Sequence, residues 1–336
     1  MIKRLLKDPL FIAGFSIILI LLVASFILTK TLHGDIPRKM LLYDKHGNLI
    51  DQAPLSPLLY PPFGTDRQGY SLFYRLMIGA KYTIGITLLI AGLRLILSLL
   101  FGLIYGIYFT RLSRFLPKLI DAFSYVPMTL LAYILLSPVI MENSVTSQFQ
   151  YSPAQRIGFE IAILTAIAIP TASLFFGNET QYILNQDYMA GVKILGASRF
   201  HILKRHVLPH LAPKIWVHFA QQMIQVLVIL IHLGLLKLFF GGTFVANGIG
   251  VTEYSSMSGE WSGLIGSSFN ELTTTPWIPF APLIMFTITL ISMQLILRAL
   301  QSAVEKTGPS PRRKKANVHI NKETPAIRPN DFTFLG

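Results

Sequence analysis

The sequence predicts an all-α integral membrane protein with six transmembrane helices and with both termini in the cytoplasm. Two features of its composition predict this class: 52% of the 336 residues are hydrophobic, and only 13% are charged. That charged share is about half of what an average soluble protein has. The third observation is that six apolar stretches are long enough to cross a bilayer. These observations exclude a soluble globular domain and a disordered chain.

Each predicted span holds about 20 or more mostly apolar residues, which is the length that a bilayer core requires. The first span follows a basic flank, but its apolar run is long and no small-residue cleavage site follows it. We therefore interpret it as a retained helix and not as a signal peptide. The six spans are Pro9–Thr29, Tyr82–Thr110, Leu119–Met141, Ile157–Gly177, Ile215–Phe240 and Ile278–Ala299.

The distribution of Lys and Arg predicts the orientation. Six spans divide the other segments into two groups, and nearly two thirds of the 29 Lys and Arg residues fall in the group that holds both termini. Basic residues accumulate on the cytoplasmic side of membranes. The net charge of +13 then reflects topology, and no nucleic-acid partner is expected. The cytoplasmic group also contains 111–118 and 178–214, and the external group contains 30–81, 142–156 and 241–277.

The chain divides into three parts. Residues 1–81 hold the first span, an external segment with a predicted hairpin turn at Asp44–Asn48, and a predicted interfacial helix over Tyr70–Lys81. Residues 82–305 form a core of five helices. Residues 306–336 form a basic, mostly polar tail that is predicted to be disordered.

The cytoplasmic loop 178–214 has the pattern of a partner surface. Two short helices with apolar stripes are predicted, because Gly196-Ala197 interrupts the first and Ser198 is a favourable N-cap for the second. Pro209 and Pro213 are expected to end the second helix before the fifth span. Exposed apolar faces of this kind usually dock onto a partner. The stripes consist of Tyr188, Met189, Val192 and Leu195 in the first helix and of Phe200, Leu203 and Val207 in the second.

Motifs for nucleotide binding or covalent chemistry are missing from the sequence. It has no G-x-x-x-x-G-K-[ST] stretch for ATP and no H-E-x-x-H stretch for zinc. The absence of cysteine excludes disulfides, thiolate metal sites and a cysteine nucleophile. His206 and His210 stand one helical turn apart, but Pro209 lies between them and no carboxylate is near. We therefore expect no catalytic residue, no metal site and no cofactor.

Two basic residues interrupt apolar runs. Arg94 stands near the middle of the second predicted span, and Lys237 stands near the end of the fifth. A basic side chain at the centre of a membrane helix costs roughly 2.5–3.5 kcal/mol on insertion scales. We therefore expect Arg94 to face the translocation path or a partner, and we keep the same hypothesis for Lys237, for which snorkelling to the interface is the alternative.

Three regions carry motifs of one known family. They are Lys3–Leu10, Gly64–Lys81 and Tyr188–Pro209; the third contains the motifs L-G-A-S at 195–198 and R-H-V-L-P at 205–209. Together these regions resemble the C-type permease subunit of dipeptide and oligopeptide ABC importers. The likeness covers roughly residues 1–308. The family's loop has Glu-Ala-Ala where this chain has Ala190-Gly191-Val192, so the acidic member of that motif is lost.

The resemblance implies a type I ABC importer permease fold that forms half of a translocation path for short peptides. It implies a bacterial-type cell membrane and three kinds of protein partner: a second, homologous permease that completes a heterodimer, two cytoplasmic ATPase subunits and an external solute-binding protein. The residues that it assigns to ATPase docking are Tyr188, Met189, Ala190, Leu195, Gly196, Ala197, Ser198, Leu208 and Pro209.

Other functions make different predictions from the sequence. Close relatives of the resembled family carry nickel chelates and other small solutes, so the substrate class stays open between these and peptides. A stand-alone secondary transporter predicts intramembrane ionisable relays and internal repeats. A membrane enzyme predicts a cluster of nucleophile, base or metal ligands at one depth. Neither pattern is evident in the sequence.

Overall fold

The computed structural model describes residues 5–33, 35–109, 115–142, 148–247 and 252–306. The predicted tail therefore lies outside the described residues, apart from Lys306. The long helices are α2 (Pro9–Leu32), α3 (Leu72–Tyr108), α10 (Leu208–Leu235) and α12 (Trp277–Glu305). The shorter helices are α4 (Leu116–Ser124), α5 (Met128–Ile140), α6 (Pro153–Ala166), α7 (Ile169–Leu184), α8 (Asp187–Ile194), α9 (Arg199–Ile202) and α11 (Trp261–Ser268). The strands are β1 (Leu41–Tyr43), β2 (Leu49–Gln52), β3 (Thr243–Asn247) and β4 (Thr252–Ser256).

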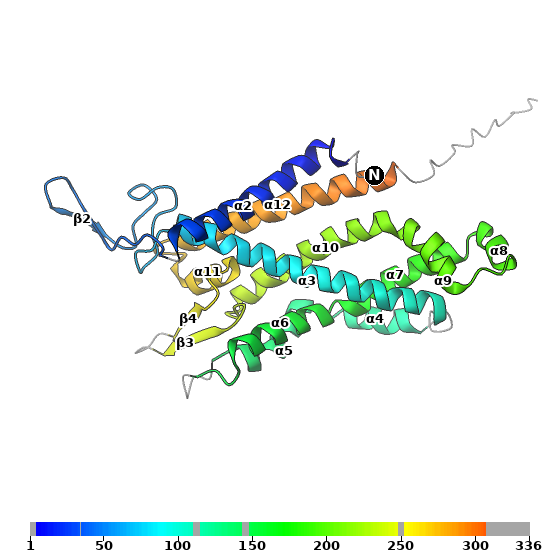
Figure 1. Ribbon diagram of the computed structural model, residues 1–336. Coiled ribbons are helices and arrows are strands. Elements are labelled where there is room, and N and C mark those ends of the chain that lie inside the picture. Colours follow the sequence, from blue (N-terminus) through cyan, green and yellow to red (C-terminus); the bar gives the residue numbers. More distant parts are fainter. Residues whose placement is uncertain (1–4, 34, 110–114, 143–147, 248–251, 307–336) are drawn as a thin grey trace, which may run out of the picture.

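The helices form an elongated bundle, with two antiparallel hairpins at one end and α8 and α9 at the other (Figure 1). The start of α2 and the end of α12 both point toward the end that carries α8 and α9. This arrangement agrees with the predicted topology, in which both termini and the 178–214 segment lie on one side. Which side is cytoplasmic stays a prediction from the charge distribution.

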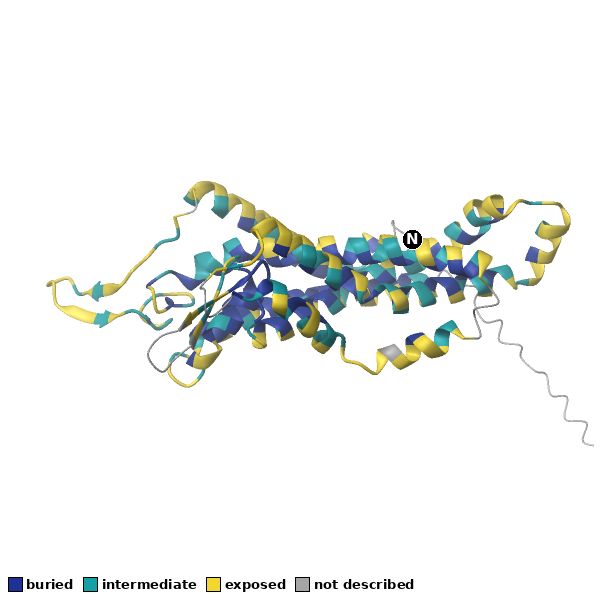
Figure 2. Ribbon diagram, turned by 90° about the horizontal axis from the view of Figure 1, so that it is seen from below, coloured by how far each residue is buried: buried dark blue, intermediate teal, exposed yellow. Residues whose placement is uncertain are grey.

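The buried core runs along the middle of the bundle, and exposed residues dominate its two ends (Figure 2). Leu76 and Ile90 of α3, Leu227 of α10 and Phe286 of α12 are fully buried. The predicted turn at Asp44–Asn48 is confirmed, because it joins β1 and β2 into the first hairpin.

Four helical stretches of the described chain are long and apolar enough to cross a membrane: α2, α3, Arg199–Leu235 and α12. A fifth span results if α6 and α7, which are bent by 40° at a short break, count as one. The predicted span Leu119–Met141 is wrong as a single helix, because the chain leaves helical geometry between α4 and α5 and Pro127 stands at the N-cap of α5. The count of six is therefore not confirmed.

The predicted interfacial helix over Tyr70–Lys81 is also wrong as a separate element. These residues form the first turns of α3, which runs unbroken for 37 residues from its N-cap Ser71. The apolar face recognised in the sequence packs inside the bundle, with Leu72, Leu76 and Ala80 at most 3% exposed. Because protein already covers this apolar face, these residues continue into α3 and do not form a separate helix at the membrane surface.

The expected stop at Pro209 and Pro213 is overturned as well. Helical structure continues from Arg199 to Leu235 through a π-helical turn at Leu203–Val207. The wider turn, in which the Leu208 N–H bonds to the Leu203 carbonyl, leaves room for the Pro209 ring, which a regular helix would press against a carbonyl. The second short helix of the loop is thus the beginning of the next membrane helix.

Candidate functional site

Within the 178–214 segment a tight turn separates α8 from α9, as predicted, while its first residues belong to α7 and its last to α10. Gly196 ends α8 with a φ of 79°, a left-handed conformation that glycine adopts without a steric penalty. The Ser198 hydroxyl then accepts a hydrogen bond from the His201 N–H at 3.2 Å and starts α9. The chain direction between the helices is therefore set by two residues that the sequence singled out.

The segment has its own small core, and this corrects one predicted contact residue. Met189 is fully buried with Ile183, Ile202, Val207 and Leu211, so it holds the segment together and does not face a partner. The spacing of apolar residues predicted that Met189 lies on the apolar face of a helix. Spacing alone does not say whether that face packs inside the chain or against a partner.

A cluster of exposed apolar side chains remains at the tip of the bundle. Leu195 is 88% exposed, Ile194 85%, Phe200 72% and Tyr188 51%. We call these four residues the tip cluster. Of the other predicted docking residues, Ala190, Gly196, Ser198 and Pro209 are exposed, and Ala197 and Leu208 are half-buried.

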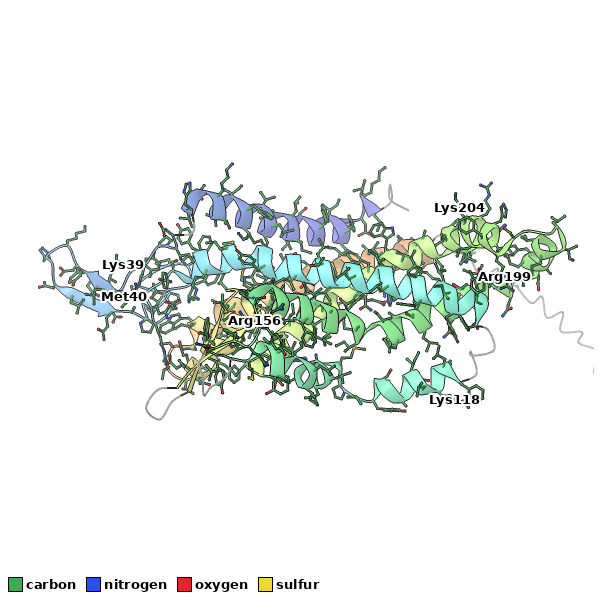
Figure 3. The ribbon with its side chains drawn as sticks, turned by 60° about the horizontal axis from the view of Figure 1, so that its bottom comes forward. Lys39, Met40, Lys118, Arg156, Arg199 and Lys204 are labelled. Carbon is green, nitrogen blue, oxygen red and sulfur yellow. The ribbon has the colours of Figure 1, made fainter. Side chains whose placement is uncertain are left out.

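Basic residues connect α8 and α9 to the helices beneath them, and one ion pair joins α7 to α10. The Lys193 ammonium donates to the Leu184 carbonyl at 3.2 Å, and Lys214 pairs with Glu179. The Arg199 guanidinium lies 5.1 Å from the centre of the Tyr108 ring, at the end of α3. Arg199 and Lys204 can be seen at this end in Figure 3. α8 is thus held to α7, and α9 is held to the end of α3.

Arg94 does not face an open path or a partner surface in this structure, contrary to expectation. Its side chain is fully buried, and its Nε donates to the Leu164 carbonyl at 2.7 Å, with Nη2 directed to the same oxygen. Its Nη1 donates to Gln225 at 3.2 Å and to Gln222 at 3.4 Å. Arg94 therefore joins α3 to α6 and α10 within the chain.

Lys237 likewise folds back onto its own chain. It follows the end of α10 in a left-handed conformation with a φ of 62°. Its ammonium donates to the Gly266 carbonyl of α11 at 2.6 Å and lies 5.8 Å from the centre of the Phe269 ring. It is half-buried, so its role here is to hold the α10–α11 connection.

Buried carboxylates near the second hairpin are a feature that sequence reasoning missed. Glu160 accepts a hydrogen bond from the Gly241 N–H, and Glu142 accepts one from the Val245 N–H, both at 2.9 Å. Glu260 caps α11, and burial raises the pKa of its carboxyl group although the N–H groups of that helix bond to it. These acids come from three separate segments of the chain. The only sequence signal for them is that each is a charged residue in a chain with few charged residues.

Arg156 is buried beside this group (Figure 3). Its guanidinium stacks 3.5 Å from the centre of the Phe149 ring, and among the described residues its Nε and Nη1 have no hydrogen-bond partner. In the described ranges there is also no group of three or more His, Asp or Glu side chains that could hold a metal ion.

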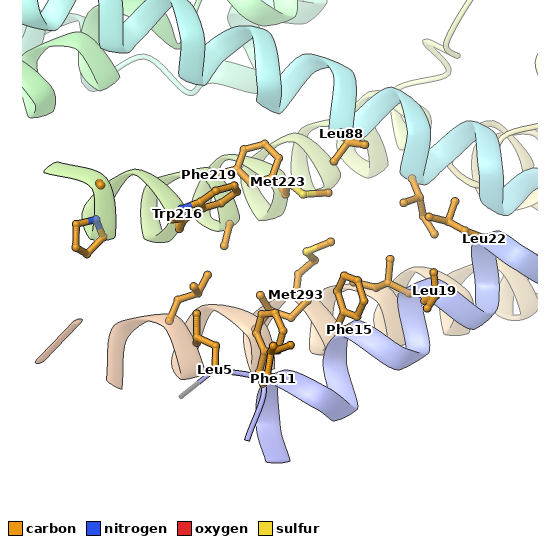
Figure 4. A pocket seen from close by; sticks show the side chains of 18 of the residues that line it. Leu5, Phe11, Phe15, Leu19, Leu22, Leu88, Trp216, Phe219, Met223 and Met293 are labelled. Carbon is orange, nitrogen blue, oxygen red and sulfur yellow. The ribbon is translucent and has the colours of Figure 1, made fainter. Parts of the chain in front are cut away.

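A cavity of about 660 Å³ opens between α2, α10 and α12 (Figure 4). Phe11 and Phe15 line it from α2, Trp216 and Phe219 from α10, and Met293 from α12. Its lining side chains are apolar apart from the indole N–H of Trp216, so the lining holds no charged group to pair with the charged ends of a polar solute.

The bundle of long apolar helices defines a multi-pass membrane protein. Residues 98–307, more than half of the chain, match the family of binding-protein-dependent transport system inner membrane components. The chain belongs to this family. The predicted family resemblance and the predicted location in the inner membrane are thereby confirmed.

Several characterised relatives are similar over most of their length. The peptide transport system permease protein SapC of Haemophilus influenzae is 28% identical over 230 residues, which cover 68% of each chain. The oligopeptide transport system permease protein OppC of Bacillus subtilis is 25% identical over 244 residues, with 72% of this chain and 70% of the relative covered. The dipeptide transport system permease protein DppC of the same organism is 21% identical over 305 residues, with 90% and 83% covered.

Proposed function

We propose that this chain is a permease subunit of an ABC importer for short peptides and that the tip cluster docks on its ATPase subunits. The observation that carries the docking proposal is the exposure of Ile194, Leu195 and Phe200 on a segment whose own core is already filled by Met189. A monomer rarely leaves such a patch uncovered. The relatives described above are named as permeases of peptide, oligopeptide and dipeptide transport systems, and this supports peptides as the substrate.

The proposal implies a machine of several parts. The chain forms half of the translocation path, and a second, homologous permease forms the other half of a heterodimer. An external solute-binding protein delivers the peptide, and two cytoplasmic ATPases hydrolyse ATP and push the 178–214 segment. Rigid movement of the membrane helices then alternates access to the path. The chain itself performs no covalent chemistry.

The docking contact is expected to be mainly apolar. Ala190 is exposed at the position where the resembled family has a glutamate, so this chain lacks one charge for an ion pair. Salt screens exposed charges within about 8–10 Å at physiological ionic strength, but it does not weaken apolar burial. The complex with the ATPases should therefore survive high salt.

The test compares two aspartate substitutions of highly exposed leucines at opposite ends of the bundle. Leu195→Asp should lower the amount of ATPase that co-purifies with the permease, and peptide uptake, by about tenfold, because burying a leucine contributes about 1.5–3 kcal/mol. Leu58→Asp is the control, because Leu58 is 94% exposed in the segment between β2 and α3. It should leave ATPase co-purification unchanged.

Equal ATPase recovery with both variants would contradict docking through the tip cluster. Peptide uptake by vesicles that contain this chain without ATPases, driven by an ion gradient, would instead support a stand-alone secondary transporter. Uptake of nickel chelates but not of peptides would support an ABC importer and contradict peptides as its substrate.

A further inference from the structure

The bent span of α6 and α7 leaves one carbonyl open to the interior of the bundle. Pro170 stands in the first turn of α7 and has no N–H to continue the helix across the break. The Ala168 N–H bonds to the Thr165 carbonyl at 3.3 Å. In a regular α-helix the Ala168 N–H would bond instead to the Leu164 carbonyl, four residues earlier. The Leu164 oxygen thus has no backbone N–H partner from residue 168 at the break where the span bends by 40°.

Arg94 satisfies this open carbonyl from the neighbouring helix α3. Two of its nitrogens bond to the Leu164 oxygen, and the third reaches Gln222 and Gln225 of α10. Within a bilayer, a released backbone carbonyl must find a donor inside the protein. The planar fork of arginine can bond both partners at once, which the single ammonium of lysine does less well. The guanidinium therefore stabilises the bent form of the span.

The two sides of the break differ in their main packing partners, although both contact α3. On one side, α7 packs against α3 with almost no space: a methyl group on Gly102 would stand 2.7 Å from the Ser173 carbonyl oxygen. Through Lys193, α7 is also tied to α8, which carries most of the tip cluster. On the other side, α6 packs against α5 and, less extensively than α7 does, against α3, and Glu160 holds the Gly241 N–H just before β3. The break thus separates the tip end of the molecule from its hairpin end.

We propose that the break at residues 167–168 is a hinge between α6 and the unit formed by α7, α8 and α9, and that Arg94 is the positioning residue that sets its angle. The proposal rests on the proposed function, because it assigns the driving push to ATPases at the tip cluster. Movement of α7 changes its angle to α6 and is transmitted to the hairpin end through Glu160. Arg94 keeps the Leu164 carbonyl bonded while the angle changes.

Spin labels can measure the hinge, because the chain has no cysteines. Cysteines at Ala162 and Tyr182 place labels on exposed positions of α6 and α7, on either side of the break. Cysteines at Asn178 and Asp187 form the control pair, because both are exposed and lie in the same unit. Distances are measured in the full transporter, assembled with its own ATPases and partner permease, first without nucleotide and then after ATP hydrolysis with vanadate, which traps ADP. The first distance should change by several ångströms and the second should not.

Substitutions separate a hinge from a merely structural contact. Arg94→Leu should lower peptide transport about tenfold and abolish the nucleotide-dependent change in the distance between the labels at positions 162 and 182. Arg94→Lys should retain part of the transport and part of this distance change. Adding Pro170→Ala to Arg94→Leu allows a continuous helix in which the Ala168 N–H bonds to the Leu164 carbonyl. This double variant should recover thermal stability but not transport.

Three outcomes would overturn the hinge. One is a wild-type transporter that imports peptide with no distance change across the break, and another is an equal change in both label pairs. The third is recovery of transport together with stability in the double variant, which would make Arg94 purely structural. If the wild-type ATPases hydrolyse ATP without driving uptake, the proposed function itself fails, and the hinge assignment fails with it.

Discussion

At the scale of the residue, backbone conformation in the tip segment is decided locally. Gly196 has open space around its Cα hydrogens, so what favours glycine there is the positive φ and not a close neighbour. Ser198 caps the helix that follows within three residues. Both features depend on adjacent atoms, and for that reason both were predictable from the sequence.

Gly196→Val should therefore uncouple the transporter. A β-branched residue in the left-handed region costs about 1–2 kcal/mol, and relief of this strain would turn α8 away from α9. We expect near-normal permease abundance, with ATP hydrolysis that no longer drives uptake. Gly191→Val is the matched control, because Gly191 lies within α8 with open space around it and no positive φ. Full transport by the Gly196→Val variant would remove this turn from the mechanism.

At the scale of the element, close helix packing and proline position decide the shape of the bundle. Pro127 and Pro170 stand at the starts of α5 and α7, next to breaks in two predicted spans. Pro213 and Pro282, in contrast, lie inside continuous helices. Proline imposes the same local penalty at each position, and the surrounding packing determines whether the helix breaks or tolerates it.

The contact between α3 and α7 gives an element-scale prediction. Gly102→Val should destabilise the protein by about 1–3 kcal/mol, because the added carbons would collide with Ser173 and Phe176 and overpack the contact. Gly92→Val in the same helix is the control, since no atom lies within 4 Å of a Cβ there. Thermal unfolding in detergent should show a lower midpoint for the first variant. An equal effect of both would mean that helix propensity, and not packing, governs this position.

At the scale of the whole molecule, the two ends of the bundle should lie on opposite sides of the membrane. Met257→Cys at the hairpin end and Leu195→Cys at the tip are suitable reporters, because these residues are 46% and 88% exposed. A membrane-impermeant maleimide should label the first in intact cells and the second only after permeabilisation. Labelling of the Leu195→Cys variant in intact cells would reverse the orientation that the basic residues predict.

The sequence by itself determined the membrane class, the family, the first hairpin and the turn between α8 and α9. Each of these depends on composition or on residues a few positions apart. Only the tertiary structure decided that Met189 is core, that Arg94 holds a broken helix and that α3 and α10 begin earlier than predicted. The reason is distance along the chain: Arg94 meets Leu164 across 70 positions and Gln225 across 131, and no local pattern reports such contacts.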